Sequence, residues 1–342
     1  MNMKRTKVTI YDIARELNLS PSTISRAIAG SDLISDEVKE KVLAKAMEMG
    51  YSSRNFRVNK GDTIAIVVPE VNNYFYHKVL KSIQQKIDNR YLVSILCSFN
   101  SFETEKAIVE KLSPSEVSCL IITQSMNATN SHHIAQAEKR GIPVIMFNRV
   151  DFDYTCPKFV IDNYMDSYLL TNHLVKSDYK RIAFAAKHFN CPIYKERIQA
   201  YSDVLAENQT PFNPDYIIYS ELTNEDITEV IMRFINLHPH PDALILPGFS
   251  AALQAISISK VYKIDIPNEM AIVSFDEDPE CRYSSPAITS IERPLPEIGR
   301  KIGELALEIS SNKKYDKNRI DLFKSNLVIR GSSLRITSPR EV

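Results

Sequence analysis

The chain has 342 residues, enough for two or three domains. It is 44% hydrophobic and 25% charged and has neither a run of about 18 apolar residues nor an apolar signal region, so we expect a soluble cytoplasmic protein without a membrane span. The formal net charge is zero, but residues 1–60 hold eleven basic and seven acidic side chains, which suggests a polyanionic partner for this first segment.

The first 50 residues predict three short helices. Thr9 and Asp12 have the spacing of a capping box, and apolar residues follow at helical intervals. The next helix begins at Ser20-Pro21, because serine is a good N-cap and proline at the first helical position loses no needed hydrogen bond. Ser35 can cap the third helix, and Gly50 stands where a C-cap glycine belongs.

The spacing of the first two helices, with three residues of turn between them, is that of a helix-turn-helix. In that motif the second helix enters the major groove, and Ser22 and Arg26 lie four residues apart on one face of it. Arginine can bond guanine bidentately, which is worth roughly 1–3 kcal/mol of discrimination. The hydroxyls suited to phosphate contacts are those of Thr9, Tyr11, Ser20, Thr23 and Ser25. A small helical bundle that makes only protein contacts is the alternative at this point.

Residues 52–62 are polar and basic, with Phe56 and Val58 as the apolar exceptions. We interpret them as a linker, and two behaviours stay open. The linker either becomes helical on DNA or is a plain flexible hinge.

From Thr63 onward, short β-branched runs alternate with amphipathic segments of helical length. Such alternation predicts parallel sheets covered by helices on both faces, and about ten strands suggest two lobes. The predicted strands are Ile64–Val68, Leu92–Cys97, Cys119–Thr123, Val144–Phe147, Phe159–Ile161, Ile182–Ala185, Tyr216–Tyr219, Ala243–Leu246, Ala271–Phe275 and Ile288–Ile291. The predicted helices span 75–88, 103–112, 131–140, 164–176, 194–207, 225–237, 249–260 and 295–311. Ligands of such folds bind beyond the carboxyl ends of the strands, so the loops that follow the strands are the candidate site.

The segment from Val8 to Tyr51 resembles the headpiece of the LacI/GalR family of bacterial repressors. The matching residues, at fixed spacing, are Val8, Thr9, Asp12, Ile13, Ala14, Leu19, Ser20, Thr23, Ile24, Ser25, Arg26, Gly30, Gly50 and Tyr51. Segments such as GIPVIMFNR, IPNEMAIVSFDED and LVIRGSS continue the resemblance in the family's order to about Ser333.

The resemblance implies an all-α helix-turn-helix headpiece and a periplasmic-binding-protein-like body of two α/β lobes. The implied domains are a headpiece at 1–51, a hinge at 52–62, a first lobe at 63–160 and 292–322, and a second lobe at 161–291 and 323–342. It also implies a transcriptional repressor that binds a pseudo-palindromic operator as a homodimer and responds to a small effector, such as a sugar. The residues at the family's ligand-facing positions are Phe75, Arg149, Asp162, Arg197, Phe249 and Asp276. Arginine side chains together with two carboxylates would suit a hydroxyl-rich ligand, although each could instead form an interlobe salt bridge or a helix cap.

The chain departs from the family at three places. Where the family has a hinge helix with a leucine that wedges into the minor groove, this chain has a shorter segment in which Arg54 and Phe56 are the candidate DNA contacts. A simple tether is the alternative there. Pro21 at the tip of the recognition helix can offer only apolar contact, for example to a thymine methyl. Gly248-Phe249 replaces an Asn-Asp pair, which removes polar contacts and adds a ring.

Other chemistries find no support in the residue pattern. The five cysteines lack CxxC spacing, His132-His133 and His238–His240 lack completing ligands, and no nucleophile elbow or phosphate loop occurs. We therefore expect neither catalysis nor a metal or cofactor. The competing hypothesis is a cytosolic ligand sensor with weakened DNA binding, which the unusual hinge motivates.

Overall fold

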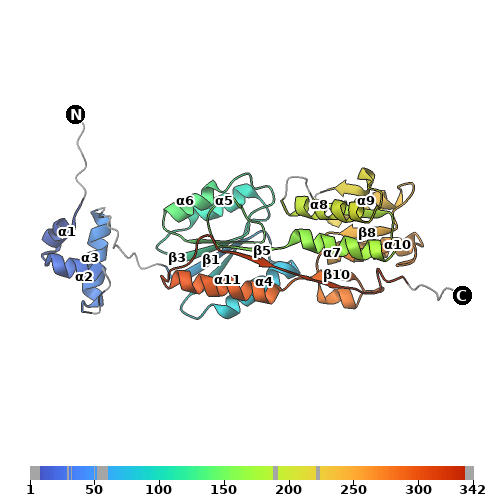
Figure 1. Ribbon diagram of the computed structural model, residues 1–342. Helices are drawn as coiled ribbons and strands as arrows, with labels where there is room; N and C mark the ends of the chain where they lie inside the picture. The colour runs from blue at the N-terminus through green and yellow to red at the C-terminus, as the bar shows by residue number, and fades with distance from the viewer. Residues whose placement is uncertain are drawn as a thin grey trace, which may run out of the picture. The chain divides into compact units, whose positions relative to one another are not determined.

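The computed structural model describes residues 8–28, 31, 33–49, 51, 61–187, 192–220 and 224–335. The chain divides into a headpiece that precedes residue 62 and a body that follows it, and each is described by itself. The headpiece holds the three expected helices, α1 (Ile10–Leu17), α2 (Pro21–Ile28) and α3 (Asp36–Glu48) (Figure 1). Their shared core consists of Ile13, Ala14, Ile24, Ala27, Ile28, Val42 and Ala46. The apolar residues at helical spacing thus close a small three-helix core.

The first lobe of the body is built on a six-stranded parallel sheet, in the order β11-β5-β4-β3-β1-β2. Its strands are β1 (Thr63–Val68), β2 (Leu92–Cys97), β3 (Val117–Ile122), β4 (Val144–Phe147), β5 (Lys158–Ile161) and β11 (Ile320–Phe323). Helices α4 (Tyr74–Lys86) and α11 (Leu295–Ser310) cover one face, and α5 (Phe102–Lys111) and α6 (His132–Lys139) cover the other (Figure 1).

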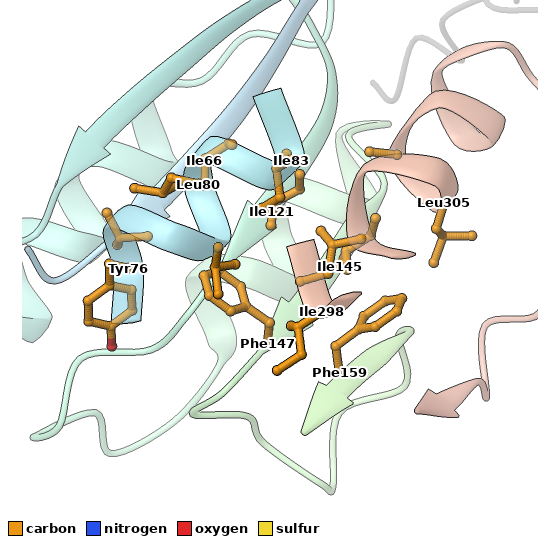
Figure 2. Packing of buried hydrophobic residues seen from close by; sticks show 14 of the residues in the cluster. Ile66, Tyr76, Leu80, Ile83, Ile121, Ile145, Phe147, Phe159, Ile298 and Leu305 are labelled. Atoms are coloured by element: carbon orange, nitrogen blue, oxygen red, sulfur yellow. The ribbon is translucent and has the colours of Figure 1, made fainter. Parts of the chain in front are cut away.

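Helices α4 and α11 share one apolar core with the strands of the first-lobe sheet (Figure 2). Val79 and Ile83 on α4 are fully buried and belong to this core. The two helices approach closely at Gly299 on α11, where an added Cβ would lie 2.4 Å from the carbonyl oxygen of Val79. Only glycine permits this contact between the two helix backbones.

The second lobe contains a six-stranded sheet in the order β12-β10-β9-β8-β6-β7. All its pairs are parallel except β12 with β10, which is antiparallel. The strands are β6 (Ile182–Ala186), β7 (Ile217–Tyr219), β8 (Ala243–Leu246), β9 (Ala271–Ser274), β10 (Thr289–Glu292) and β12 (Asn326–Val328). One face carries α7 (Asn163–Lys176) and α8 (Pro192–Glu207), and the other carries α9 (Asn224–Ile235) and α10 (Phe249–Val261).

The predicted fold class is confirmed: a helical headpiece and a body of two parallel-dominated α/β lobes. All ten predicted strands and all eight predicted body helices are present, with ends shifted by at most three residues. Strands β11 and β12 were not predicted, and the chain passes between the lobes three times, after β5, β10 and β11. None of the helices in the described residues is both long and apolar enough to cross a lipid bilayer.

Candidate DNA-reading helix and effector cleft

The turn between α1 and α2 has the geometry of a helix-turn-helix. Three residues separate Leu17, the last residue of α1, from Pro21, the first of α2. Asn18 adopts the left-handed conformation, with φ at 53°, and the N–H of Leu19 donates to the carbonyl of Ala14 at 3.0 Å. Asparagine tolerates this conformation better than most residues, because its short polar side chain can hydrogen-bond locally. The turn is therefore encoded by its own residues.

Ser20 fixes the start of α2. Its hydroxyl oxygen accepts a hydrogen bond from the N–H of Thr23 at 3.0 Å, and its carbonyl accepts from Ile24, also at 3.0 Å. The hydroxyl also lies 2.8 Å from the hydroxyls of Ser22 and Thr23. Pro21 occupies the first helical position, as expected. Ser20 thus has a structural role that is independent of any contact to phosphate.

Helix α2 separates a buried side from an exposed side. Ile24, Ala27 and Ile28 are buried in the headpiece core, whereas Ser22, Ser25 and Arg26 are exposed. Tyr11 on α1 is also exposed, at 64% of its full surface. An exposed guanidinium and a set of exposed hydroxyls on the second helix of this motif are suited to contact base edges and phosphates.

At the start of α1, the carboxylate of Asp12 holds Thr9. It accepts the backbone N–H of Thr9 at 2.9 Å and the Thr9 hydroxyl at 2.7 Å. The hydroxyl bond and the backbone bond from Thr9 lower the pKa of Asp12. The Thr9 hydroxyl hydrogen is therefore already engaged, and a phosphate would have to compete with Asp12 for it. Arg54 and Phe56, the other predicted DNA contacts, lie outside the described residues.

A cleft of about 770 Å³ lies between the lobes, where the carboxyl ends of the strands of both sheets meet. Five of the six predicted effector residues line it, namely Phe75, Arg149, Arg197, Phe249 and Asp276. The sixth, Asp162, lines an adjoining cavity of about 660 Å³, and Arg149 borders both. The structure thus brings together most of the residues that the sequence singled out.

Arg149 and Asn148 follow β4 and meet at one tyrosine. The hydroxyl of Tyr76 accepts from Nη2 of Arg149 and from Nδ2 of Asn148, each at 3.2 Å. Asn148 has a φ of 60°, which turns the chain sharply at the end of the strand. The Nε of Arg149 is buried and has no hydrogen-bond partner among the described residues. Arg149 is therefore held in place, and no carboxylate of the described residues pairs with it.

Arg197, on α8, is the most deeply buried of the predicted effector residues, with 6% of its surface exposed. Its guanidinium lies 3.9 Å from the centre of the Phe275 ring and donates to the amide oxygen of Asn163 at 3.2 Å. Its Nε has no partner in the described part of the chain. Burial, and then the neighbouring charge of Arg293, lower the pKa of this guanidinium.

Asp276 is engaged by a residue that the sequence did not single out. Arg293 follows β10, and its guanidinium donates to the carboxylate of Asp276 and, at 3.2 Å, to that of Asp166 on α7. Only 8% of the Arg293 side chain is exposed. The one available sequence signal was its place, a basic residue immediately after a predicted strand in the segment SIERP.

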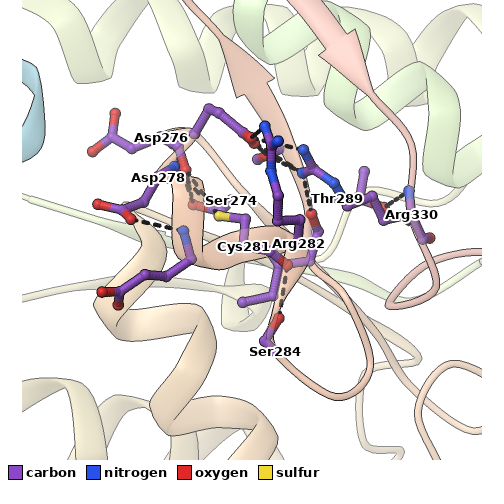
Figure 3. Close-up of polar contacts among 12 residues, drawn as sticks. Ser274, Asp276, Asp278, Cys281, Arg282, Ser284, Thr289 and Arg330 are labelled. Atoms are coloured by element: carbon purple, nitrogen blue, oxygen red, sulfur yellow. Dashed lines mark hydrogen bonds and ion pairs between the residues drawn. The ribbon is translucent and has the colours of Figure 1, made fainter.

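The loop that carries Asp276 is held by a dense set of polar contacts (Figure 3). The Asp276 N–H donates to the hydroxyl of Ser274 at 3.2 Å, and Glu277 accepts two hydrogen bonds from Arg330, at 2.7 and 2.8 Å. Gly248 lies against the loop, where an added Cβ would be 3.0 Å from an Asp276 carboxylate oxygen. Asp276 is therefore a fixed feature of the cleft.

The adjoining cavity is acidic. It is lined by Asp151, Asp153, Asp162 and Glu196. Asp162 caps α7 by accepting the N–H of Met165 at 2.9 Å, so the helix-cap alternative for this residue is realised. Burial, and then the charge of Asp162, raise the pKa of Glu196. No group of three or more potential metal ligands occurs among the described residues.

Comparisons with known proteins agree on both parts of the chain. Residues 9–54 match the model of bacterial regulatory proteins of the lacI family, and residues 171–333 match the periplasmic binding protein-like domain. The HTH-type transcriptional repressor CytR of Escherichia coli (strain K12) is 26% identical over 336 residues, covering 96% of this chain and 97% of CytR. Catabolite control protein A of Priestia megaterium is 24% identical over 322 residues, covering 92% of this chain and 96% of that protein.

A solved structure shares the fold across both parts. The crystal structure of the lac repressor dimer bound to operator and the anti-inducer ONPF superposes with a TM-score of 0.70 at 19% identity, covering 96% of this chain and 100% of that one. The two family models together match more than half of the chain, in the order headpiece then body. The chain therefore joins a DNA-binding domain of the lacI family to a periplasmic-binding-protein-like domain, and it is a DNA-binding transcriptional regulator.

Proposed function

We propose that the protein is a repressor that binds a pseudo-palindromic operator as a homodimer and is modulated by a small polar effector held between its lobes. The observation that carries the DNA-binding part is the exposed face of α2, with Ser22 and Arg26 on a helix whose start is fixed by Ser20. One helix of eight residues reads few base pairs alone, so a two-fold arrangement with two half-sites is needed for a specific site. The lac repressor structure is a dimer on its operator, which supports this proposal.

The cleft carries the regulatory part of the proposal. It is enclosed by both lobes and is lined by arginines, carboxylates and aromatic rings, the groups that bind small polar metabolites. An effector that contacts both lobes favours the arrangement in which they are closed around it. Coupling of that arrangement to operator binding is typically worth about 1–3 kcal/mol.

The test is a selection of genomic fragments by the full-length protein at physiological salt concentration, followed by footprinting of the selected sites. We expect protected sites with two-fold symmetry and half-sites about one helical turn apart or a multiple of it. A protein that selects no specific fragment, with or without cell metabolites, would contradict the proposal.

A truncation distinguishes the proposed function from the competing one, a ligand sensor with weakened DNA binding. A chain lacking residues 1–58 retains the whole cleft but not the headpiece. We expect this truncation to abolish regulation of the genes next to the selected sites. Unchanged regulation would favour the sensor.

A further inference from the structure

Three of the five carboxylates that line the cleft already accept hydrogen bonds from the protein itself. Asp276 accepts from Arg293, Glu277 accepts twice from Arg330, and Asp278 accepts the N–H of Glu280 at 3.0 Å. The remaining acidic residues that line the cleft, Glu70 and Glu292, are exposed. Carboxylates are the strongest acceptors for the hydroxyl hydrogens of a neutral, hydroxyl-rich ligand, and those in the buried part of this cleft already accept hydrogen bonds from the protein.

The guanidiniums of Arg149 and Arg197 also line the cleft, but they have no carboxylate partner among the described residues. Neither Arg149 nor Arg197 lies within 4.0 Å of a carboxylate in the described part of the chain, and each keeps a buried Nε without a partner. Their contacts are to neutral groups, the Tyr76 hydroxyl and the Asn163 amide. Buried charges in proteins are normally paired, because an uncompensated charge in a low-dielectric site is costly.

We propose that the effector is an anion, a small metabolite with a phosphate or carboxylate group that binds Arg149 and Arg197. Guanidinium groups form short, charge-assisted and often bidentate bonds with both anions, which supplies the missing countercharge. The inference rests on the proposed function, because it names the class of effector for the same cleft.

The surroundings of the two arginines define the rest of the ligand. Phe75 and Phe249 line the same cleft and offer apolar surface for a ring or carbon chain. Beyond Arg149, the adjoining cavity presents Asp162 and Glu196. A ligand that spans both spaces would place its anionic group at the arginines and its hydroxyl groups toward Asp162 and Glu196, because carboxylates repel the former and accept hydrogen bonds from the latter.

The experiment measures thermal unfolding of the full-length protein at constant ionic strength. The probes are inorganic phosphate, glucose, glucose 6-phosphate and glucuronate, with sodium chloride as the reference salt. We expect a saturable rise of the unfolding midpoint with inorganic phosphate and with at least one anionic sugar, and none with glucose. The phosphate and carboxylate arms identify which anion the site takes.

Matched variants place the effect in the cleft. Arg149→Gln and, separately, Arg197→Met should each raise the half-saturating concentration of the anion at least 10-fold. Arg300→Gln, on the exposed surface of α11, should not change it. The proposal is overturned if glucose stabilises as well as the anions do, if no probe differs from chloride, or if the anion effect persists in both cleft variants. The DNA selection does not use these probes, so its failure would contradict the proposed function and leave the result with the anions separate.

Discussion

Arg293 donates a hydrogen bond from its guanidinium to the carboxylate of Asp276, within the cleft between the lobes. Arg293 stands where the chain leaves the second lobe for α11 of the first, so the pair joins a cleft wall to a connection between the lobes. From the sequence, Asp276 could be either an effector contact or a partner in a salt bridge. The structure shows that its carboxylate pairs with Arg293.

Removal of Arg293 should be strongly destabilising. Arg293→Met retains most of the volume but leaves the carboxylates of Asp276 and Asp166 without their shared partner, and Asp166 is fully enclosed. Breaking a buried ion pair from one side typically costs about 3–5 kcal/mol. Urea unfolding, followed by circular dichroism, measures the change in the free energy of unfolding.

The control for this variant is Arg300→Met, which removes an exposed i, i+4 pair with Glu304 and should cost less than about 1 kcal/mol. Adding Asp276→Asn to Arg293→Met should recover part of the loss, because it removes one of the unpaired charges. Equal stabilities of the Arg293→Met and Arg300→Met proteins would show that the buried pair does not stabilise the fold.

Arg26 should contribute mainly to sequence preference. Because it is the exposed guanidinium on α2, Arg26→Ala should weaken binding to a selected operator by about 1–3 kcal/mol per half-site while changing binding to random duplex much less. Fluorescence anisotropy with both duplexes at several salt concentrations measures the two affinities. Arg15→Ala, an exposed arginine on α1, is the charge-matched control. Equal losses on both duplexes for Arg26→Ala would argue against direct readout.

Ser20 allows helix capping to be separated from phosphate contact. Ser20→Ala should destabilise the headpiece by about 0.5–2 kcal/mol, because Thr23 loses the acceptor for its N–H. Ser20→Asp should keep the cap but repel the DNA backbone, so we expect near-normal headpiece stability with weakened binding at low salt. The measurements are thermal unfolding and anisotropy. If Ser20→Asp bound DNA as tightly as the unaltered protein, Ser20 would have no place near a phosphate.

Glu196 should make the body less stable as the pH rises. Its pKa is raised in the folded protein by burial and by Asp162, so the folded state holds this proton more tightly than the unfolded state does. Unfolding stability should therefore fall as the pH rises from the carboxyl's ordinary range through the raised pKa. Glu196→Gln should flatten this part of the profile and unfold at a higher temperature at pH 7. A parallel profile for both proteins would exclude Glu196 as the cause.

Most of the fold followed from local patterns. The headpiece helices were predicted because their caps and apolar spacing agree, as at Ser20-Pro21, and the strands of the body because most are short, buried β-branched runs. Strands β11 and β12 escaped prediction because they are short and largely exposed, with no run of buried apolar residues. Ile320 and Leu322 of β11 are exposed on either side of Asp321, and the strand has only four residues, too short a pattern to separate from a loop.

Most residues of the candidate site were predicted, but the ion pairs among its charged side chains were not. The resemblance to the family singled out Arg149, Arg197 and Asp276, and all three line one cleft. Pairing depends on contacts between segments far apart in the chain, such as Asp166 with Arg293, and no local pattern reports these. The same limit applies to Arg330, whose bonds to Glu277 bridge 53 positions.

The three passages between the lobes also govern the order in which the protein can fold during synthesis. The first lobe gains its strand β11 only when Ile320–Phe323 has left the ribosome, and α11, which seals one face of its sheet, emerges shortly before. The second lobe lacks only β12 by that time. The lobe that begins first is therefore completed almost last, and its open sheet face and edge stay exposed through most of translation. A truncation near residue 320 would thus leave both lobes unfinished, although it removes few residues.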